Sequence, residues 1–305
     1  MSRHLGERGL LLIIFAPVFA SSLLAQARPS PALDSSATRS AATAPAPKPR
    51  VWLDPDGKLL PFASDEAVLE FLRTARVVSA KDIPVGVTAP QKLLLEKDGI
   101  RANAHFSFID EDKPVATLRG GKREVGFRDS YRFQAAAYEL ALLLGMDNVP
   151  PAVPRTLSGR HGAVSIWIEK TMTERDRIKN KVNPPRPMDW IRQKENMHVF
   201  DNLIYNTDRN QGNILIDEDW KLWMIDHTRA FRRVDNLLEP PSMGLCGKTL
   251  WQRLQEVSDS EIEARLKPHL TRPEINSLLK RRVKIVAFLN KLIQEKGEGS
   301  VLFKE

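Results

Sequence analysis

Residues 201–231, DNLIYNTDRNQGNILIDEDWKLWMIDHTRAF, decide the fold. The stretch begins as the end of a helix and continues, after a polar loop, as two short apolar strands joined by a tight turn. Asp208 lies in the loop, Asn213 opens the first strand, and Asp226 closes the second. Because antiparallel strands joined by a tight turn bring their outer ends together, we expect Asn213 and Asp226 to be neighbours, with Asp208 within reach of both.

These three side chains form a set that suits phosphoryl transfer. A carboxylate and an amide oxygen on adjacent backbone segments are hard ligands of the kind that Mg²⁺ or Mn²⁺ prefers. A second carboxylate nearby can accept the proton of an attacking hydroxyl group. Transfer of a phosphoryl group from ATP needs such a base and oxygen ligands for the metal ions that bridge the phosphates. The alternative is a surface β-hairpin whose Asn and Asp residues form turns.

The spacing Asp-x4-Asn, followed by an Asp at the end of a strand, resembles the catalytic and metal-binding loops of the protein-kinase-like fold. The pattern N-T-D-R-N-x-G-N-x-L-I…I-D-H-x-x-A-F is similar to that of its atypical branch, which includes the Golgi casein kinases of the secretory pathway, the HipA-type kinases and the type II phosphatidylinositol 4-kinases. The resemblance covers roughly residues 82–300 and is sharp over 201–231. It implies an α+β, two-lobed protein-kinase-like fold with a small β-rich N-lobe and a mostly helical C-lobe.

The resemblance also implies roles in the C-lobe. Asp208 would be the catalytic base, and Asn213 and Asp226 would be the metal ligands. The catalytic Asp of the atypical branch is followed by Arg, as Asp208 is followed by Arg209. Asp201 could hold Arg209 in place, although a charge on the helix surface is an equally open interpretation.

Two segments of the N-lobe would bind the nucleotide. Trp167-Ile168-Glu169 would form the hinge between the lobes and present backbone groups to adenine, so we name Glu169 as a cofactor-binding residue. Residues 85–88, Val-Gly-Val-Thr, would approach the phosphates, with Gly86 and Thr88 as candidates. This loop has one glycine, so an ordinary turn is an open alternative.

The small lobe departs from the family pattern in two places. After a hairpin of this kind the family usually shows a Phe-Lys pair whose lysine holds the phosphates, whereas here Ser107 follows Phe106. In the next helix the family usually shows a Glu before small residues, whereas RFQAAAYEL has Gln134. Glu139 lies five residues on, about 140° round the helix, and faces elsewhere. The usual Lys–Glu pair is therefore absent, which leaves a nucleotide-binding pseudokinase or scaffold without turnover as the alternative function.

Lys92 is a candidate replacement for the missing lysine. With Asp98-Gly99 as a two-residue hairpin turn, Lys92 pairs with His105. Paired residues share one face of a sheet, so Lys92 points the same way as Ser107, which occupies the vacant lysine position. The opposite face carries Leu, Ala and Phe side chains and is the expected core face. The alternative is that Lys92 is a solvated strand residue.

The rest of the chain indicates strands followed by helices, as in an α+β domain. The expected elements are a helix from 65 to 75 capped by Ser64, strands at 91–97, 100–109, 113–119 and 162–168, helices at 129–144 and 188–205, and helices after 250.

The N-terminus has the features of an export signal. Two arginines and a histidine within residues 3–8 precede an apolar run of 16 residues, which ends before the small-x-small site Ala25-Gln26-Ala27. The run is short for a bilayer core of ~30 Å at 1.5 Å per residue. We therefore expect a signal peptide over 1–27, with an uncleaved membrane anchor over 9–24 as the alternative. The mature protein would be exported, periplasmic or secreted, without a stable transmembrane span.

Composition sets the remaining limits. The 305 residues are 42% hydrophobic, which excludes disorder of the whole chain, and a single Cys excludes an internal disulfide. Pro, Ala, Ser and Thr fill 17 of the 23 positions in residues 28–50, which we interpret as a disordered linker before a kinase-like domain at 51–305, with an N-lobe at 51–168 and a C-lobe at 169–305.

Net charge is +8, of which the first 50 residues supply +4. The mildly basic remainder suits a phosphate-rich ligand and does not indicate nucleic acid. We therefore expect an exported phosphotransferase that uses ATP and Mg²⁺ or Mn²⁺ and acts on a hydroxyl of a protein, a sugar or a lipid head group.

Overall fold

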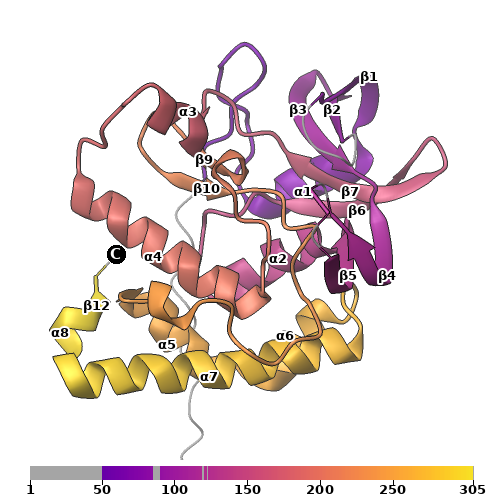
Figure 1. The fold of residues 1–305 in the computed structure, drawn as a ribbon. Helices are drawn as coiled ribbons and strands as arrows, with labels where there is room; N and C mark the ends of the chain where they lie inside the picture. Colours follow the sequence, from indigo (N-terminus) through magenta and orange to yellow (C-terminus); the bar gives the residue numbers. More distant parts are fainter. Residues whose placement is uncertain (1–49, 85–89, 119, 122, 305) are drawn as a thin grey trace, which may run out of the picture. The chain divides into compact units, whose positions relative to one another are not determined.

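The computed structural model describes residues 50–84, 90–118, 120–121 and 123–304. The expected signal peptide, the linker up to residue 49, and Gly86 and Thr88 of the expected phosphate loop lie outside these residues. Within the described part, a sheet-rich N-terminal part is followed by a helical C-terminal part, coloured from salmon through orange to yellow in Figure 1. This is the α+β arrangement that the sequence predicts.

A five-stranded antiparallel sheet forms the centre of the N-terminal part, in the order β1-β2-β3-β7-β6. Its strands are β1 (Arg76–Asp82), β2 (Gln91–Lys97), β3 (Ile100–Ser107), β6 (Ala152–Leu157) and β7 (Arg160–Ile166). The predicted register of the β2–β3 hairpin is confirmed, because Lys97 pairs with Ile100 and Lys92 pairs with His105. The predicted core face is confirmed as well: its buried side chains are Leu93, Leu95, Ala102, Ala104 and Phe106.

Two helices pack on this sheet. In α1 (Asp65–Thr74), the predicted cap is confirmed, because the Ser64 hydroxyl accepts a hydrogen bond from the Ala67 amide at 3.3 Å. α2 (Arg132–Leu143) contacts β6 and β7 and buries nearly its whole length. A single cluster of buried apolar side chains continues from these elements into the helical part.

A second, two-stranded ribbon consists of β4 (Asp110–Thr117) and β5 (Arg123–Ser130). The sequence placed one strand here and started the following helix at Asp129, and this was wrong. Asp129 and Ser130 instead end β5, where they pair with Glu111 and Asp110. The Ser130 amide also donates to the Thr228 carbonyl at 2.8 Å, so long-range pairing holds these residues out of the helix. β1 and β6 were likewise not predicted.

The C-terminal part is mostly helical. Its elements are β8 (Met172–Thr173), α3 (Glu174–Lys179), α4 (Pro187–Ile204), η1 (Gln211–Asn213), β9 (Ile214–Ile216), β10 (Leu222–Met224), η2 (Pro240–Ser242), β11 (Cys246–Gly247), α5 (Lys248–Glu256), α6 (Asp259–Leu266), α7 (Arg272–Lys296), α8 (Glu298–Val301) and β12 (Leu302–Phe303). The long helices α4 and α7 contact each other, and β9 lies between β10 and β8. In the ranges that the structure describes, no helix combines the length and apolar character needed to cross a bilayer.

The turn between β9 and β10 is built by Asp217. Its Oδ1 accepts hydrogen bonds from the amides of Asp219 (3.0 Å) and Lys221 (2.9 Å), and its Oδ2 accepts from Trp223 Nε1 at 2.8 Å. These bonds fold the chain back so that Ile214 pairs with Met224. The predicted pair of short strands joined by a tight turn is therefore confirmed.

Gly162 lies where β7 approaches β3 closely. A Cβ atom there would clash with the ring of Phe106 and lie 2.5 Å from the Ser107 carbonyl oxygen. Because Phe106 is buried in the core, it cannot swing aside. We expect Gly162→Ala to lower the free energy of unfolding by about 1–3 kcal/mol, the usual cost of overpacking, in a chemical denaturation experiment. In the control Gly299→Ala the added Cβ meets nothing within 4 Å, and equal stability of the two variants would contradict this account.

Candidate active site

Asn213 and Asp226 lie next to each other at the open end of the β9–β10 hairpin. Beyond the last pair of the hairpin, the Ile225 amide donates to the Asn213 carbonyl at 3.2 Å. Asp226 follows with a φ of 55°, in the left-handed region that non-glycine residues seldom adopt. Such strain is found mainly where the surrounding structure enforces it, often at functional sites. The structure thus brings the two predicted metal ligands together.

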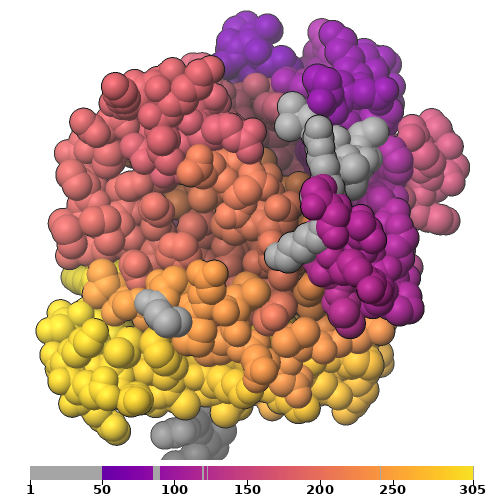
Figure 2. Space-filling model, in the orientation of Figure 1, coloured from indigo at the N-terminus to yellow at the C-terminus, as the bar shows by residue number. Residues whose placement is uncertain are grey.

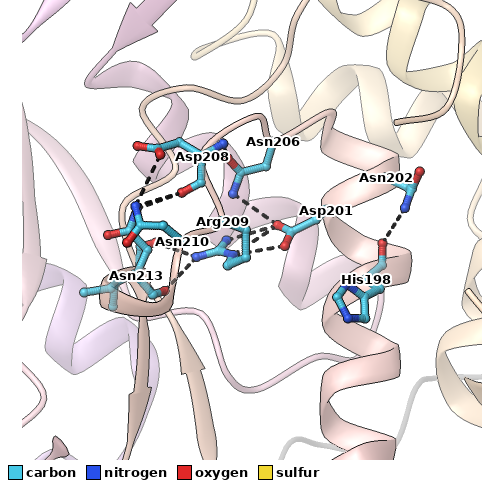
Figure 3. A network of polar contacts seen from close by, with 9 residues as sticks. His198, Asp201, Asn202, Asn206, Asp208, Arg209, Asn210 and Asn213 are labelled. Atoms are coloured by element: carbon cyan, nitrogen blue, oxygen red, sulfur yellow. Dashed lines mark hydrogen bonds and ion pairs between the residues drawn. The ribbon is translucent and has the colours of Figure 1, made fainter. Parts of the chain in front are cut away.

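Asp208 lies in the loop between α4 and η1, where three asparagines hold it (Figure 3). The Asp208 amide donates to Asn206 Oδ1 at 3.0 Å, and Asn210 Nδ2 donates to Asp208 Oδ1 at 3.2 Å. Asn213 Nδ2 donates to the Asp208 carbonyl at 2.8 Å. This last bond connects the predicted base to a predicted ligand. It also uses the amide nitrogen of Asn213, so the amide oxygen is the end that can bind a cation.

Arg209 connects this loop to the hairpin and to α4. Its Nη1 donates to the carbonyls of Asn213 (2.8 Å) and Ile225 (2.7 Å). Its Nε lies 3.0 Å from Asp201 Oδ2, and its Nη2 lies 3.1 Å from Asp201 Oδ1. Figure 3 shows the guanidinium between Asp201 and the loop that carries Asp208. Of the two interpretations left open by the sequence, the structure selects the one in which Asp201 holds Arg209.

The ion pair between Arg209 and Asp201 is more deeply buried than the three candidate site residues. The side chains of Arg209 and Asp201 are each 7% exposed. Asp208, Asn213 and Asp226 are all partly exposed. The predicted base and ligands can therefore contact a bound molecule, whereas the ion pair behind them is closed to solvent.

The helix position at which the resemblance leads us to expect a Glu carries a buried amide. Gln134 Oε1 accepts a hydrogen bond from the His227 amide at 3.2 Å, directly after Asp226. Burial, and secondarily the nearby Arg209 charge, hold the pKa of His227 well below its usual value, so the ring is neutral. His227 packs edge-on against Phe200. In the described ranges, no three His, Cys, Asp or Glu side chains are grouped so as to hold a metal among themselves. His227 therefore has no partners for a zinc-type site, and we interpret it as a packing residue.

His105, on β3, lies within electrostatic range of Asp226. Burial lowers the pKa of His105, and the negative charge of Asp226 opposes that shift, so the two groups lie near each other. Ser107, which occupies the vacant lysine position, is buried. The sequence indicated only that His105 lies on the polar face of the hairpin. That pattern alone could not show that His105 lies within range of Asp226.

Lys92 contacts the expected hinge segment, which also contains Glu169. Lys92 Nζ lies 4.2 Å from the centroid of the Trp167 ring, a cation–π contact. Asn103 Nδ2 donates to Glu169 Oε1 at 2.6 Å. Lys92 and Asn103 line a cavity of about 400 Å³. The described residues that line this cavity do not include Asp208, Asn213 or Asp226.

Asp129 lies beside the candidate site, which the sequence did not reveal. It is 7% exposed, and within the described residues its Oδ1 has no hydrogen-bond partner. It contacts the Thr228 hydroxyl, which donates to Asp226 Oδ1 at 3.0 Å. Burial raises the pKa of Asp129 to about 6, and the charge of Asp226 adds to the effect. The carboxylates of Asp129 and Asp226 thus lie on either side of the Thr228 hydroxyl. No local pattern in the sequence predicts this arrangement.

The β4–β5 ribbon also holds the segment that follows Asp226. Glu124 on β5 accepts hydrogen bonds from Arg229 (2.7 Å) and from Arg232. Arg233 pairs with Asp112 on β4 at 3.2 Å. In the space-filling view, the magenta surface of this ribbon adjoins the orange surface that contains these arginines (Figure 2). Ion pairs therefore connect the two parts of the chain on this face.

Comparison of the sequence with family models finds no match, and a search of curated proteins finds none either. Solved structures do match. Hydra Fam20 with sugar superposes with a TM-score of 0.62 at 15% identity, over 80% of this chain and 94% of that one. The Golgi casein kinase superposes with a TM-score of 0.59 at 14% identity, over 79% and 80% of the two chains. The chain has an atypical protein-kinase-like fold.

A bacterial kinase shares this fold at greater distance. The Helicobacter pylori proinflammatory kinase CtkA matches with a TM-score of 0.50 at 11% identity, over 73% of this chain and 98% of that one. Identities this low show the fold alone. Neighbours of this kind support a phosphotransferase of the kinase type, and they imply the use of ATP and divalent metal in general.

The residues of this kinase-like site fit a hard divalent cation. The Asn213 amide oxygen accepts no hydrogen bond from the described residues, and the Asp226 carboxylate is partly exposed. Asp129, which contacts the Thr228 hydroxyl that donates to Asp226, has a further carboxylate oxygen with no hydrogen-bond partner among the described residues. Oxygen donors without nitrogen or sulfur are the set that suits Mg²⁺ or Mn²⁺.

The raised pKa of Asp129 makes stability depend on pH. The native state holds this proton more tightly than the unfolded chain does, so the stabilisation is complete below the ordinary pKa near 3.8 and is lost as the pH rises through about 6. In EDTA, we expect Asp129→Asn to melt at a higher temperature than wild type at pH 8. This advantage should disappear near pH 4.

Thermal melts at the two pH values measure this difference. Asp219→Asn changes an exposed carboxylate of the β9–β10 turn and serves as the control. A difference between Asp129→Asn and wild type that is the same at both pH values would show that Asp129 does not titrate in this way.

Proposed function

We propose that the protein is an ATP- and metal-dependent phosphotransferase that acts on a hydroxyl acceptor. The observation that carries this proposal is the connected set of Asp208, Asn213 and Asp226 at the end of the β9–β10 hairpin. One backbone bond, from the Ile225 amide to Asn213, and two side-chain bonds, from Arg209 to Ile225 and from Asn213 to Asp208, connect the segments that carry the three residues. The kinase-like fold supports the same conclusion independently of these residues.

Asp208 is the proposed general base. Asn210 occupies its Oδ1, and within the described residues no group donates to Oδ2, which can take a proton. The acceptor oxygen forms a bond to the γ-phosphorus, the bond from that phosphorus to the bridging oxygen of ADP breaks, and the hydroxyl proton passes to Asp208. Asn213 and Asp226, with Asp129 behind them, would hold the divalent ion, which neutralises phosphate charge when bound.

The nucleotide would enter from the side of Lys92 and the hinge. The cavity that Lys92 lines is basic on its strand side, where Lys81 and Arg101 also contribute. Glu169 is tied to Asn103 through its side chain, which leaves its backbone groups for adenine. In this proposal Lys92 supplies positive charge near the nucleotide, and Gly86 and Thr88 approach the phosphates.

A nucleotide-binding pseudokinase or scaffold is the second candidate. The observation that favours it is the neutral pair in the place of the usual Lys and Glu. Ser107 is buried, and Gln134 is committed to the His227 amide. Neither side chain carries the charge that would hold the phosphates in the usual way. The intact set of base and ligands favours the enzyme.

The structural neighbours bear on the acceptor, and the N-terminal sequence bears on the compartment. One neighbour is a casein kinase of the Golgi, and another was solved with sugar, so a hydroxyl of a protein or a sugar is the acceptor we favour over a lipid head group. The apolar run and the small-x-small site near the N-terminus support export with cleavage after Ala27.

Asp208→Asn separates the enzyme from the scaffold. The substitution keeps the size of the side chain and removes the base, so we expect transfer of labelled phosphate from ATP with Mn²⁺ to fall by about 100-fold or more. ATP binding should change little, because Asp208 contacts the acceptor in this mechanism. Residues 28–305 would be incubated with protein and sugar acceptors. Wild type that binds ATP but transfers nothing to any acceptor, water included, would favour the scaffold.

Asp226→Ala tests the metal site. We expect ATP to raise the melting temperature of wild type more with Mn²⁺ than with EDTA, because a ligand that binds only the native state stabilises it. The variant should lose the metal-dependent part of this shift. Asp219→Ala, on the turn at the other end of the hairpin, should retain it. A full metal-dependent shift in Asp226→Ala would remove this residue from the site.

A further inference from the structure

A buried ion pair stands directly behind the two proposed metal ligands. One nitrogen of Arg209, Nη1, donates to the Asn213 carbonyl at 2.8 Å and to the Ile225 carbonyl at 2.7 Å. The first carbonyl belongs to one ligand, and the second belongs to the peptide bond that leads into the other, Asp226. A single planar group therefore sets how far apart the two ligand-bearing backbones lie.

Asp201 fixes Arg209 from the other side. Nε of Arg209 lies 3.0 and 3.3 Å from the two carboxylate oxygens of Asp201, and Nη2 lies 3.1 Å from Oδ1. Asp201 itself is on the last turn of α4, and Asn206 donates to its Oδ1 at 3.1 Å. Nε, both hydrogens of Nη1 and one of Nη2 are engaged, which is four of the five donors of a guanidinium. Arg209 and the ligands are thus held by the buried C-terminal end of α4.

The chemistry of this arrangement requires arginine. Its rigid fork can pair with a carboxylate and reach two carbonyls at once, whereas a lysine ammonium is a point charge on a flexible chain. Both charges of the Arg209–Asp201 pair are buried, and a buried pair is costly unless its remaining groups are also bonded. Here the carbonyls beside the ligands provide those bonds.

An arginine near a kinase active site can instead receive a phosphate that orders the following segment. Arg209 is committed to a carboxylate of its own chain. The arginines after Asp226 are committed as well: Arg229 and Arg232 pair with Glu124, and Arg233 pairs with Asp112. These arginines are thus already paired with carboxylates of the same chain.

We propose that Arg209, anchored by Asp201, is a positioning residue that sets the spacing of Asn213 and Asp226 without a phosphate on the chain. This proposal rests on the proposed function, because it concerns the same metal ligands. Arg209 touches neither nucleotide nor acceptor in the mechanism above. Its loss should therefore weaken metal binding first and leave the chemical step largely available when metal is saturating.

Arg209→Lys tests the proposal. We expect the Mn²⁺ concentration for half-saturation to rise about 10- to 100-fold, the range typical for partners that orient metal ligands, with most of kcat recovered at saturating Mn²⁺. Free Mn²⁺ measured by electron paramagnetic resonance in the presence of ATP gives the affinity without reference to turnover. Asp201→Asn keeps the guanidinium but removes the carboxylate charge that holds it, so we expect a smaller rise in the Mn²⁺ half-saturation concentration. This variant replaces Arg209→Lys in the test if Arg209→Lys does not fold.

Arg155→Lys is the matched control. Arg155 also donates to two backbone carbonyls, those of Leu72 (2.7 Å) and Ala75 (2.6 Å), but it does so in the N-terminal sheet, away from the ligands. Its replacement should lower the melting temperature and leave the Mn²⁺ half-saturation unchanged. A general loss of stability would raise the Mn²⁺ half-saturation concentration of both variants, whereas loss of positioning raises only that of Arg209→Lys.

The outcomes separate this proposal from the proposed function. Wild type that binds no Mn²⁺ with ATP would overturn both. Wild type that binds Mn²⁺ together with an Arg209→Lys variant of equal affinity would overturn only the positioning role. Phosphatase treatment of wild type should leave the half-saturation unchanged, and a 10-fold rise after treatment would show that a phosphate on the chain contributes to the spacing.

Discussion

The contact on which the candidate site depends is the buried pair between Arg209 and Asp201. It joins three pieces of chain that the sequence keeps separate: the end of α4, the loop with Asp208, and the hairpin ends with Asn213 and Asp226. Because both charges are removed from water, the pair is costly to bury unless most of the remaining guanidinium donors find acceptors. The carbonyls beside the ligands satisfy this need, so the condition for burying the charge also sets the geometry of the site.

The sequence predicted the parts of the fold that local contacts decide. The β9–β10 hairpin and the β2–β3 hairpin each have a turn residue at the right place and an apolar face with the period of a strand, so their registers could be derived. Ser64 could be identified as a cap because its partner, Ala67, is three residues away. Asp208, Asn213 and Asp226 could be brought together because one hairpin connects them.

The parts that were missed depend on partners far along the chain. Asp129 lies at the end of β5, which is held by its pairing with β4 and by a bond from Ser130 to Thr228, nearly a hundred residues away. Without those contacts, the polar pair before an apolar run resembles the start of a helix. The proximity of His105 to Asp226 has the same origin, since the alternation of β3 shows its face but not what packs on that face.

The two departures from the family pattern balance each other in charge. The usual lysine and glutamate sum to zero. Here Ser107 is neutral, Gln134 is neutral, and burial keeps the neighbouring His105 neutral by lowering its pKa. Loss of the lysine alone would have left an uncompensated carboxylate beside Asp226. Loss of both the lysine and the glutamate leaves the net charge around Asp226 the same as with the usual Lys–Glu pair. Gln134 keeps a structural role, because it accepts a hydrogen bond from the His227 amide next to Asp226. Asp226 and Asp129 then supply the negative charge of the candidate site. Such a pair of carboxylates is suited to hold a divalent cation, which in turn binds nucleotide phosphates.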